Sequence, residues 1–419
     1  MKSSAVPVSA TPFYYGWLIL AATAVSELLA QGATSYAAGL FVLPLQNEFH
    51  ISRAVANMPV LIMFLGAALV APLVGKALDR YPIRLVISLG AIIFSLSFIG
   101  IALSGSLLVM AALLFLPTAI GFMGTGPLTT SAMASRWFYR RRGLALGIAA
   151  VATSGGGFTV VPLLSRAIQQ YGWRMGLVYE AVIMGIIMVG LAWLVLRDRP
   201  SDMGLDQHPE NLGREKAEAA LRNSGPALRW HDILGSRAFW IPSLVLAMVS
   251  GTSQALVVTM VPYGVSLGQA AVTAAGLISA FAIAAAITKI AAGLLADHLN
   301  QRLLLIAAAL LMTMAWLNLA VFAAPWALLA SSCMAGIALG CALPTAAALI
   351  AAYFGSARFG AAMGWTYTLV GIVSIAASLS IGFIYDRLGG YHSAFVIFSS
   401  LLAAVLATTL LIAPARRAA

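Results

Sequence analysis

Long apolar runs, separated by short clusters of charge, dominate this chain of 419 residues. Hydrophobic residues make up 61% of the chain and charged residues only 9%, whereas soluble globular domains contain about 25% charged residues. Many of the runs reach the length of about 20 residues at which an α-helix crosses a bilayer. The pattern therefore excludes a water-soluble domain and predicts an all-α membrane protein with many spans.

The apolar runs predict twelve transmembrane helices. They cover residues 14–42, 54–75, 83–104, 106–134, 143–168, 174–196, 238–265, 272–295, 302–323, 325–353, 359–384 and 391–414. If the N-terminus is cytoplasmic, 19 of the 24 Lys and Arg residues fall on the cytoplasmic side, in agreement with the positive-inside rule. Topology thus explains the net charge of +11 and argues against a nucleic-acid-binding protein. We expect a multi-pass protein of the inner (plasma) membrane with cytoplasmic N- and C-termini.

One stretch, residues 197–237, interrupts the apolar pattern. It holds 14 of the 37 charged residues, so it cannot pack into lipid. We predict that it is a cytoplasmic linker between two six-helix bundles, formed by residues 1–196 and 238–419. A short surface helix is expected within the linker, around residues 215–222.

The two halves of the chain repeat each other at a nearly constant offset. Asp79 and Asp297 follow matching glycines and are separated by 218 positions. Residues 143–147 (GLALG) and 360–364 (GAAMG) are separated by 217 positions. This offset predicts a duplicated six-helix unit in parallel orientation. Parallel repeats are one architecture of membrane transporters, and their substrate site lies at the repeat interface near the middle of the bilayer.

Several motifs resemble those of a known family. Residues 75–80 (GKALDR) and 293–298 (GLLADH) resemble the loop signature of the major facilitator superfamily. Residues 14–17 (YYGW), 136–147 (RWFYRRRGLALG) and 261–268 (VPYGVSLG) resemble its branch of monocarboxylate porters and oxalate–formate exchangers. The resemblance implies twelve helices in two pseudo-symmetric bundles that transport a solute by alternating access.

Four charged residues of these motifs are candidates for gating. Asp79, Arg80, Arg136 and Asp297 lie at the predicted cytoplasmic ends of helices. There, we expect them to pair with neighbouring helix termini and to latch the two bundles together in one conformational state.

Lys289 is the strongest candidate for the substrate site. Ionisable residues inside membrane spans are costly and are functional candidates by default. In the resembling family a basic residue, usually arginine, occupies this position and pairs with the substrate carboxylate. The equivalent residue of the first half is Ala71, so the cation belongs to one repeat only. The alternative is a lysine that extends its ammonium toward the membrane surface.

Two carboxyl groups also lie within predicted spans. Glu27 is midway along the first span, where it could couple transport to a proton, serve as a hydrogen-bonded structural group, or contact the substrate directly. Glu180 lies near the outer end of the sixth span, and we expect it to pair structurally with Arg174 or Tyr179.

The sequence departs from the resembling family at two places. Many monocarboxylate porters carry an aspartate one turn before the basic residue, where this chain has Ala285. The oxalate exchanger has a second lysine in span 11, which this chain lacks. One cation predicts a substrate with one carboxylate. Hydrogen bonds and apolar contacts to a small acid are expected from Tyr36, Gln254, Trp365 and Tyr367.

Together these observations predict a secondary transporter of small organic anions, most simply monocarboxylates, that works by proton-coupled symport. An obligate organic-anion exchanger and a multidrug efflux transporter of the same superfamily are the alternatives. A membrane enzyme is disfavoured because no His or Asp lies mid-span. The expected partners are a carboxylate, protons and the lipid bilayer. We expect a functional monomer that needs no cofactor or metal ion.

Overall fold

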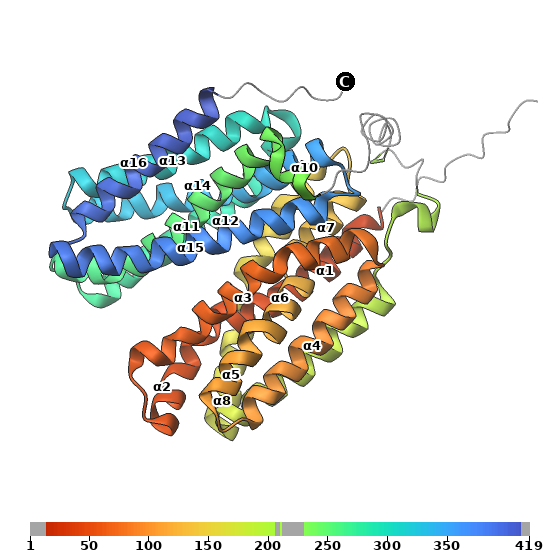
Figure 1. Cartoon of the computed structure of the whole chain (residues 1–419), viewed down its shortest axis with the longest axis horizontal. Helices are drawn as coiled ribbons and strands as arrows, with labels where there is room; N and C mark the ends of the chain where they lie inside the picture. The colour runs from red at the N-terminus through yellow and green to blue at the C-terminus, as the bar shows by residue number, and fades with distance from the viewer. Residues whose placement is uncertain (1–13, 206–209, 212–229, 412–419) are drawn as a thin grey trace, which may run out of the picture.

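A computed structural model describes residues 14–205, 210–211 and 230–411 of the chain (Figure 1). Its first half contains α1 (Gly16–Gln31), the π-helix η1 (Gly32–Tyr36), α2 (Ala38–Phe49), α3 (Arg53–Arg80), α4 (Ile83–Leu103), α5 (Leu107–Leu113), the π-helix η2 (Leu114–Thr118), α6 (Ala119–Thr125), α7 (Pro127–Trp137) and α8 (Arg142–Leu194). Then follow η3 (Pro200–Met203), α10 (Trp230–Gly235), α11 (Arg237–Ser266), α12 (Ala271–His298), α13 (Gln301–Val321), α14 (Pro325–Phe354), α15 (Phe359–Leu388) and α16 (His392–Leu411). The helix expected around residues 215–222 lies outside the described residues.

Ten helical segments of the described chain are long and apolar enough to cross a membrane. One of them, α8, has 53 residues and holds two predicted spans, because its backbone leaves the helical conformation at Gly172 (φ 80°, ψ 162°). Glycine adopts this conformation readily since it lacks a Cβ atom. The shorter apolar helix α16 holds the last predicted span. With no strand among the described residues, the predicted all-α membrane fold is confirmed.

The helices form two bundles, α1–α8 and α11–α16, here called the first and the second bundle (Figure 1). The bundles lie closest at the end that holds α7 and α10 and diverge toward the end that holds α2 (Figure 1). We call these the linker end and the far end, since α10 lies within the predicted linker, residues 197–237. At the linker end Phe354, Phe359 and Met363 of the second bundle are buried in the core of the first.

At the far end, an ion pair fastens α2 to the second part of α8. The guanidinium of Arg174 lies 2.5 Å from a carboxylate oxygen of Glu48 and also donates to the carbonyls of Ala102 and Ser104 at the end of α4. The indole of Trp173 donates to the same carboxylate at 2.7 Å. Arg174 therefore joins α8 to both α2 and the end of α4.

The expected pairing of Glu180 with Arg174 or Tyr179 is wrong. Residues 174 and 180 are separated by about 1.7 helical turns and point to different faces of α8. Arg174 instead bonds neighbouring helices, and the ring of Tyr179 packs edge-on against Tyr171. Both carboxylate oxygens of Glu180 are buried without a hydrogen-bond partner among the described residues.

Replacing Glu48 by glutamine is expected to lower the melting temperature by roughly 1–3 °C at pH 7, because a partly exposed ion pair contributes little. The hydrogen bond from Arg174 holds the pKa of Glu48 below its usual value of 4.5. Its stabilisation is therefore complete well above pH 4.5 and is lost as the pH falls through the lowered pKa. Thermal melts of both proteins at falling pH test this: a difference that stays constant with pH would contradict the assignment.

Candidate functional site

Lys289 is buried between the two bundles. Its side chain extends from α12, and the residue is 6% exposed. The ammonium donates to the hydroxyl of Thr153 at 2.5 Å and to that of Ser154 at 3.0 Å, both on α8 of the first bundle. In the described part of the chain no carboxylate oxygen lies within 4.0 Å of it. The buried cation thus has neutral ligands only in this conformation.

Close helix packing brings Lys289 to these hydroxyls. A Cβ atom on Gly147 of α8 would lie 2.5 Å from the Lys289 carbonyl oxygen, and one on Gly293 of α12 would lie 2.6 Å from the Gly143 carbonyl oxygen. Only small residues allow two helix backbones to approach so closely in a membrane. The glycines therefore set the reach of the lysine across the interface.

Tyr36 lies beside the hydroxyl groups that hold Lys289. It ends the π-helix η1, is 45% exposed, and interacts with Ser154. Its ring lies over Gly157, where a Cβ atom would be 3.1 Å away. The π-helical turn begins at Gly32, which packs against Gly156, and such turns occur frequently at functional sites. Tyr36, Ser154 and Lys289 therefore form one cluster.

Glu27 and Tyr367 come from opposite bundles and lie near each other. Glu27 is 1% exposed, lies beside Thr130, and is within electrostatic reach of Lys289. The hydroxyl of Tyr367 is buried near Ser131 and Glu27. Neither this hydroxyl nor the Oε1 atom of Glu27 has a hydrogen-bond partner among the described residues. The interface therefore contains a second polar cluster, formed around a carboxyl group.

The two remaining candidates for substrate contact lie in different surroundings. Trp365 is half-buried and packs against the core of the first bundle. Gln254 is exposed on α11, and no described contact joins it to Lys289. The assignment of both residues to the substrate site stays a prediction.

Two carboxylates cross between the bundles at the linker end. Asp79, at the end of α3, accepts hydrogen bonds from the amides of Gly360 (2.9 Å) and Ala361 (2.8 Å) in the first turn of α15. Asp297, at the end of α12, accepts from Gly143 (2.5 Å) and Leu144 (2.9 Å) in the first turn of α8. A carboxylate is favourable at a helix N-terminus, where amides lack partners and the helix dipole is positive.

The two arginines predicted for gating differ in position. Arg136 donates to the carbonyl of Leu78 and is within electrostatic reach of Asp79. Arg80 is exposed and lies over the ring of Tyr81. Among the described residues, only the first arginine therefore belongs to the Asp79 contact.

The hydrogen bonds that join the bundles in the described chain lie toward the linker end. Measured along α12, Lys289 is about 12 Å from Asp297, given a rise of 1.5 Å per residue. Along α3, the carbonyl of Ala68, which accepts from Thr368, is about 17 Å from Asp79 by the same measure. The Thr368–Ala68 bond therefore lies deepest among these described contacts, and Lys289 lies between it and the linker end.

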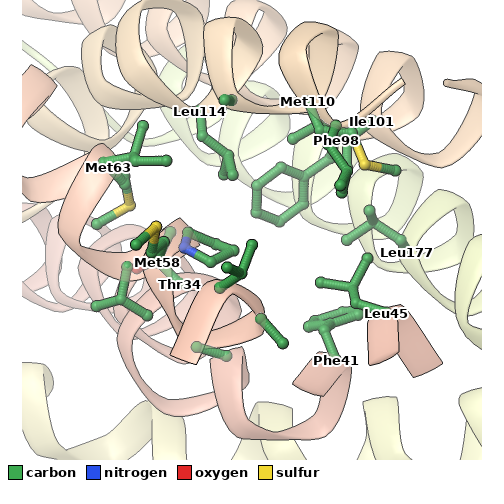
Figure 2. A pocket seen from close by; sticks show the side chains of 18 of the residues that line it. Thr34, Phe41, Leu45, Met58, Met63, Phe98, Ile101, Met110, Leu114 and Leu177 are labelled. Carbon is green, nitrogen blue, oxygen red and sulfur yellow. The ribbon is translucent and has the colours of Figure 1, made fainter. Parts of the chain in front are cut away.

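An apolar cavity of about 390 Å³ lies elsewhere, within the first bundle near the far end. Figure 2 shows Phe41 and Leu45 on one side and Phe98 and Met110 on another, with apolar side chains around them. None of the predicted site residues lines it. An anion has no charged partner there, so the chemistry favours the interface around Lys289.

Sequence reasoning missed Thr153 and Ser154 as the ligands of Lys289. Hydroxyl side chains within a span are common, and nothing in their pattern distinguishes these two. The available signal was their position directly before the glycines 155–157, where another helix can approach closely.

Comparison with known proteins places this geometry in a family. The model of the Major Facilitator Superfamily matches residues 23–279 and 246–419. The oxalate:formate antiporter of Oxalobacter formigenes is 26% identical over 262 residues, which cover 61% of this chain and 57% of that protein. Monocarboxylate transporter 12 of Rattus norvegicus is 25% identical over 415 residues, covering 93% of this chain and 84% of that protein. The match spans 38% of the length of one curated relative and 57% of the length of the oxalate:formate antiporter.

Solved structures share the fold. The proton:xylose symporter XylE bound to 6-bromo-6-deoxy-D-glucose superimposes with a TM-score of 0.72 at 16% identity, over 96% of each chain. The family match extends over most of the sequence and agrees with the two bundles and their interface. This protein belongs to the Major Facilitator Superfamily of membrane transporters.

Proposed function

We propose that this transporter carries small monocarboxylates by alternating access and that Lys289 binds the substrate carboxylate. The observation that carries the proposal is the burial of this cation between the bundles, where its ligands among the described residues are two hydroxyl groups. An unpaired charge inside a protein costs several kcal/mol, which a bound anion would offset. The site is therefore complementary to one negative charge.

The contacts suggest how binding couples to closure. A carboxylate that pairs with Lys289 takes over hydrogen bonds now made by Thr153 and Ser154, which belong to the opposite bundle. Tyr36 is part of the same cluster and provides a hydroxyl and an apolar ring beside it. Neutralising the ammonium allows the loaded site to be enclosed without a bare charge. The bundles can then exchange contacts at the linker end for contacts at the far end.

The relatives support a carboxylate substrate. Their names specify monocarboxylate transport and oxalate:formate exchange. This chain has one lysine within its predicted spans, and Trp365 and Tyr367 occupy the interior of the eleventh span. A single cation fits a monocarboxylate better than a dicarboxylate.

Glu27 is the proposed proton-coupling group. It is buried, one of its oxygens is unpartnered among the described residues, and it lies within electrostatic reach of Lys289. When ionised, it could compensate the lysine charge in the empty carrier, and substrate binding would then favour its protonation. The two groups form no ion pair within 4.0 Å in the described chain. That separation favours the second candidate function, an obligate exchanger whose empty carrier cannot return.

Replacing Glu27 by glutamine is expected to reduce accumulation driven by a proton gradient at least about tenfold, a typical size for a coupling free energy. Counterflow, which exchanges labelled for unlabelled substrate, should continue. Proteoliposomes with an imposed pH gradient measure both processes for a panel of monocarboxylates. Glu180→Gln is the matched control, because it neutralises a buried carboxyl away from the interface and should behave like the wild type.

Three outcomes would change this proposal. Gradient-driven accumulation by Glu27→Gln at the wild-type level removes the coupling role from Glu27. Counterflow without accumulation in the wild type identifies an exchanger. Transport of lipophilic cations in place of carboxylates identifies multidrug efflux.

We also place the linker end in the cytoplasm of the cell that makes the protein. The distribution of Lys and Arg supports this orientation, which makes the N- and C-termini cytoplasmic in an inner (plasma) membrane. The substrate site is built within one chain, so a monomer suffices for transport.

A further inference from the structure

Two residues of the linker are buried against the first bundle. Glu210 is 8% exposed and Asn211 is 4% exposed. Glutamate and asparagine side chains are rarely buried to this extent without a hydrogen-bond partner, since burying polar groups is costly. Their contacts identify what this part of the linker does.

Glu210 bonds the turn between α7 and α8. Its Oε1 accepts from the amide of Arg141 at 2.6 Å, and its backbone carbonyl accepts from the amide of Arg140 at 3.2 Å. Its Oε2 lies 4.0 Å from the guanidinium Nε of Arg141. Arg141 is the N-cap residue of α8, so the linker carboxylate binds the start of this helix.

Asn211 fastens the same segment on the other side of the turn. Its amide nitrogen donates to the hydroxyl of Tyr14 at 3.2 Å and to the carbonyl of Leu205 at 3.0 Å. Tyr14 in turn donates to the carbonyl of Trp137, the last residue of α7. The linker is therefore bound to the end of one helix and to the beginning of the next.

The same helix start carries the cross-bundle contact of Asp297. Glu210 bonds the amide at position 141, and Asp297 bonds the amides of Gly143 and Leu144. The two carboxylates are close enough to interact electrostatically. Arg141 faces Glu210, and Arg142 and His298 face Asp297, so basic groups from both bundles offset the repulsion.

The contacts of Asp297 with the start of α8 and of Asp79 with the start of α15 are here called the two latches. Among the described residues, the Asp79 latch lacks the support of a linker carboxylate. By the repeat offset, Arg141 corresponds to Arg358, which is the N-cap residue of α15. In the part of the chain that the structure describes, Asp79 bonds Gly360 and Ala361, and no carboxylate is bonded to the amide of Arg358. Among the described residues, the two latches that the duplication makes equivalent are therefore unequal, and Glu210 of the linker is the source of the difference.

We propose that Glu210 is a positioning residue of the transport cycle, which holds the first turn of α8 where Asp297 can bind it. The linker thereby stabilises the conformation that is closed at the linker end and biases the two-state equilibrium of the carrier. This inference rests on the alternating-access part of the proposed function and is independent of the substrate.

A reporter of opening at the linker end tests the proposal without substrate. Ala351 of α14 is 1% exposed and packs in the core shared with the first bundle. Ala351→Cys, in a background of Cys333→Ser and Cys341→Ser, should react with a maleimide only when the bundles separate there. Glu210→Gln keeps an acceptor oxygen but removes its charge, and it is therefore expected to raise the labelling rate of purified protein about fivefold. Glu48→Gln, at the far end, is the control and should leave the rate unchanged.

A double-mutant cycle separates positioning from general loosening. Glu210→Gln should raise labelling about fivefold in an Asp79→Asn background and less than about twofold in an Asp297→Asn background. Equal effects in both backgrounds, or no effect in the parent, would overturn the role of Glu210. If neither aspartate variant raises labelling, the latches and the role of Glu210 in them are both overturned. Failure of carboxylate transport alone would leave the labelling result, and this inference, standing.

Discussion

Replacing Lys289 by alanine is expected to lower carboxylate uptake at low substrate concentration at least about a hundredfold. Removing one partner of a buried charge pair costs about 3–5 kcal/mol, and each 1.4 kcal/mol corresponds to about a factor of ten in affinity. The variant also removes the ammonium that bonds Thr153 and Ser154 across the interface. Initial uptake rates in proteoliposomes measure the loss.

Two further variants separate the charge of Lys289 from its packing. Lys289→Arg keeps the charge and is expected to retain measurable uptake, with altered substrate preference because the guanidinium is planar and bidentate. Thr153→Val removes one hydroxyl acceptor of the charged ammonium and should lower uptake roughly tenfold. Uptake by Lys289→Ala within threefold of the wild type would show that the lysine has no role in binding.

The second large effect is expected from Gly360→Leu. A Cβ atom there would lie 2.4 Å from the carbonyl oxygen of Gly75 and 2.7 Å from a carboxylate oxygen of Asp79. Since such a clash with backbone cannot be relieved by a rotamer change, α15 must move away from α3. The linker end should then stay open, transport should fall to background, and labelling of Ala351→Cys should rise about tenfold or more.

The same helix provides the control for this variant. A Cβ atom on Gly382 of α15 would meet no atom within 4 Å, and the residue is exposed. Gly382→Leu should therefore transport and label like the wild type. Loss of transport in both variants, or unchanged labelling in Gly360→Leu, would contradict a gate that closes through the contact between Gly75 and Gly360.

The sequence predicted the fold because hydrophobic length and repeat offset are properties of the chain itself. Asp79 and Asp297 are equivalent residues of the repeat, 218 positions apart. In the structure Asp79 binds Gly360 and Asp297 binds Gly143, and these two glycines are also equivalent in the repeat. The gating role inferred from this symmetry, the exact division into bundles and linker, and the substrate residues remain predictions.

The features that sequence reasoning missed depend on tertiary packing. The π-helical turn that ends at Tyr36 begins at Gly32, which contacts Gly156 on another helix. The pairing of Arg174 with Glu48 joins residues separated by 126 positions, which helical periodicity cannot anticipate. Glu210 was one of many charged linker residues, and only its burial distinguishes it.

The most direct test of the account is a thermal-shift screen of purified protein against small monocarboxylates, dicarboxylates and lipophilic cations, with Lys289→Ala measured in parallel. Any ligand that binds the folded state raises the melting temperature. We predict that particular monocarboxylates stabilise the wild type and that this stabilisation disappears in Lys289→Ala. Stabilisation that survives the substitution, or a response to lipophilic cations in place of acids, would contradict the proposed carboxylate site.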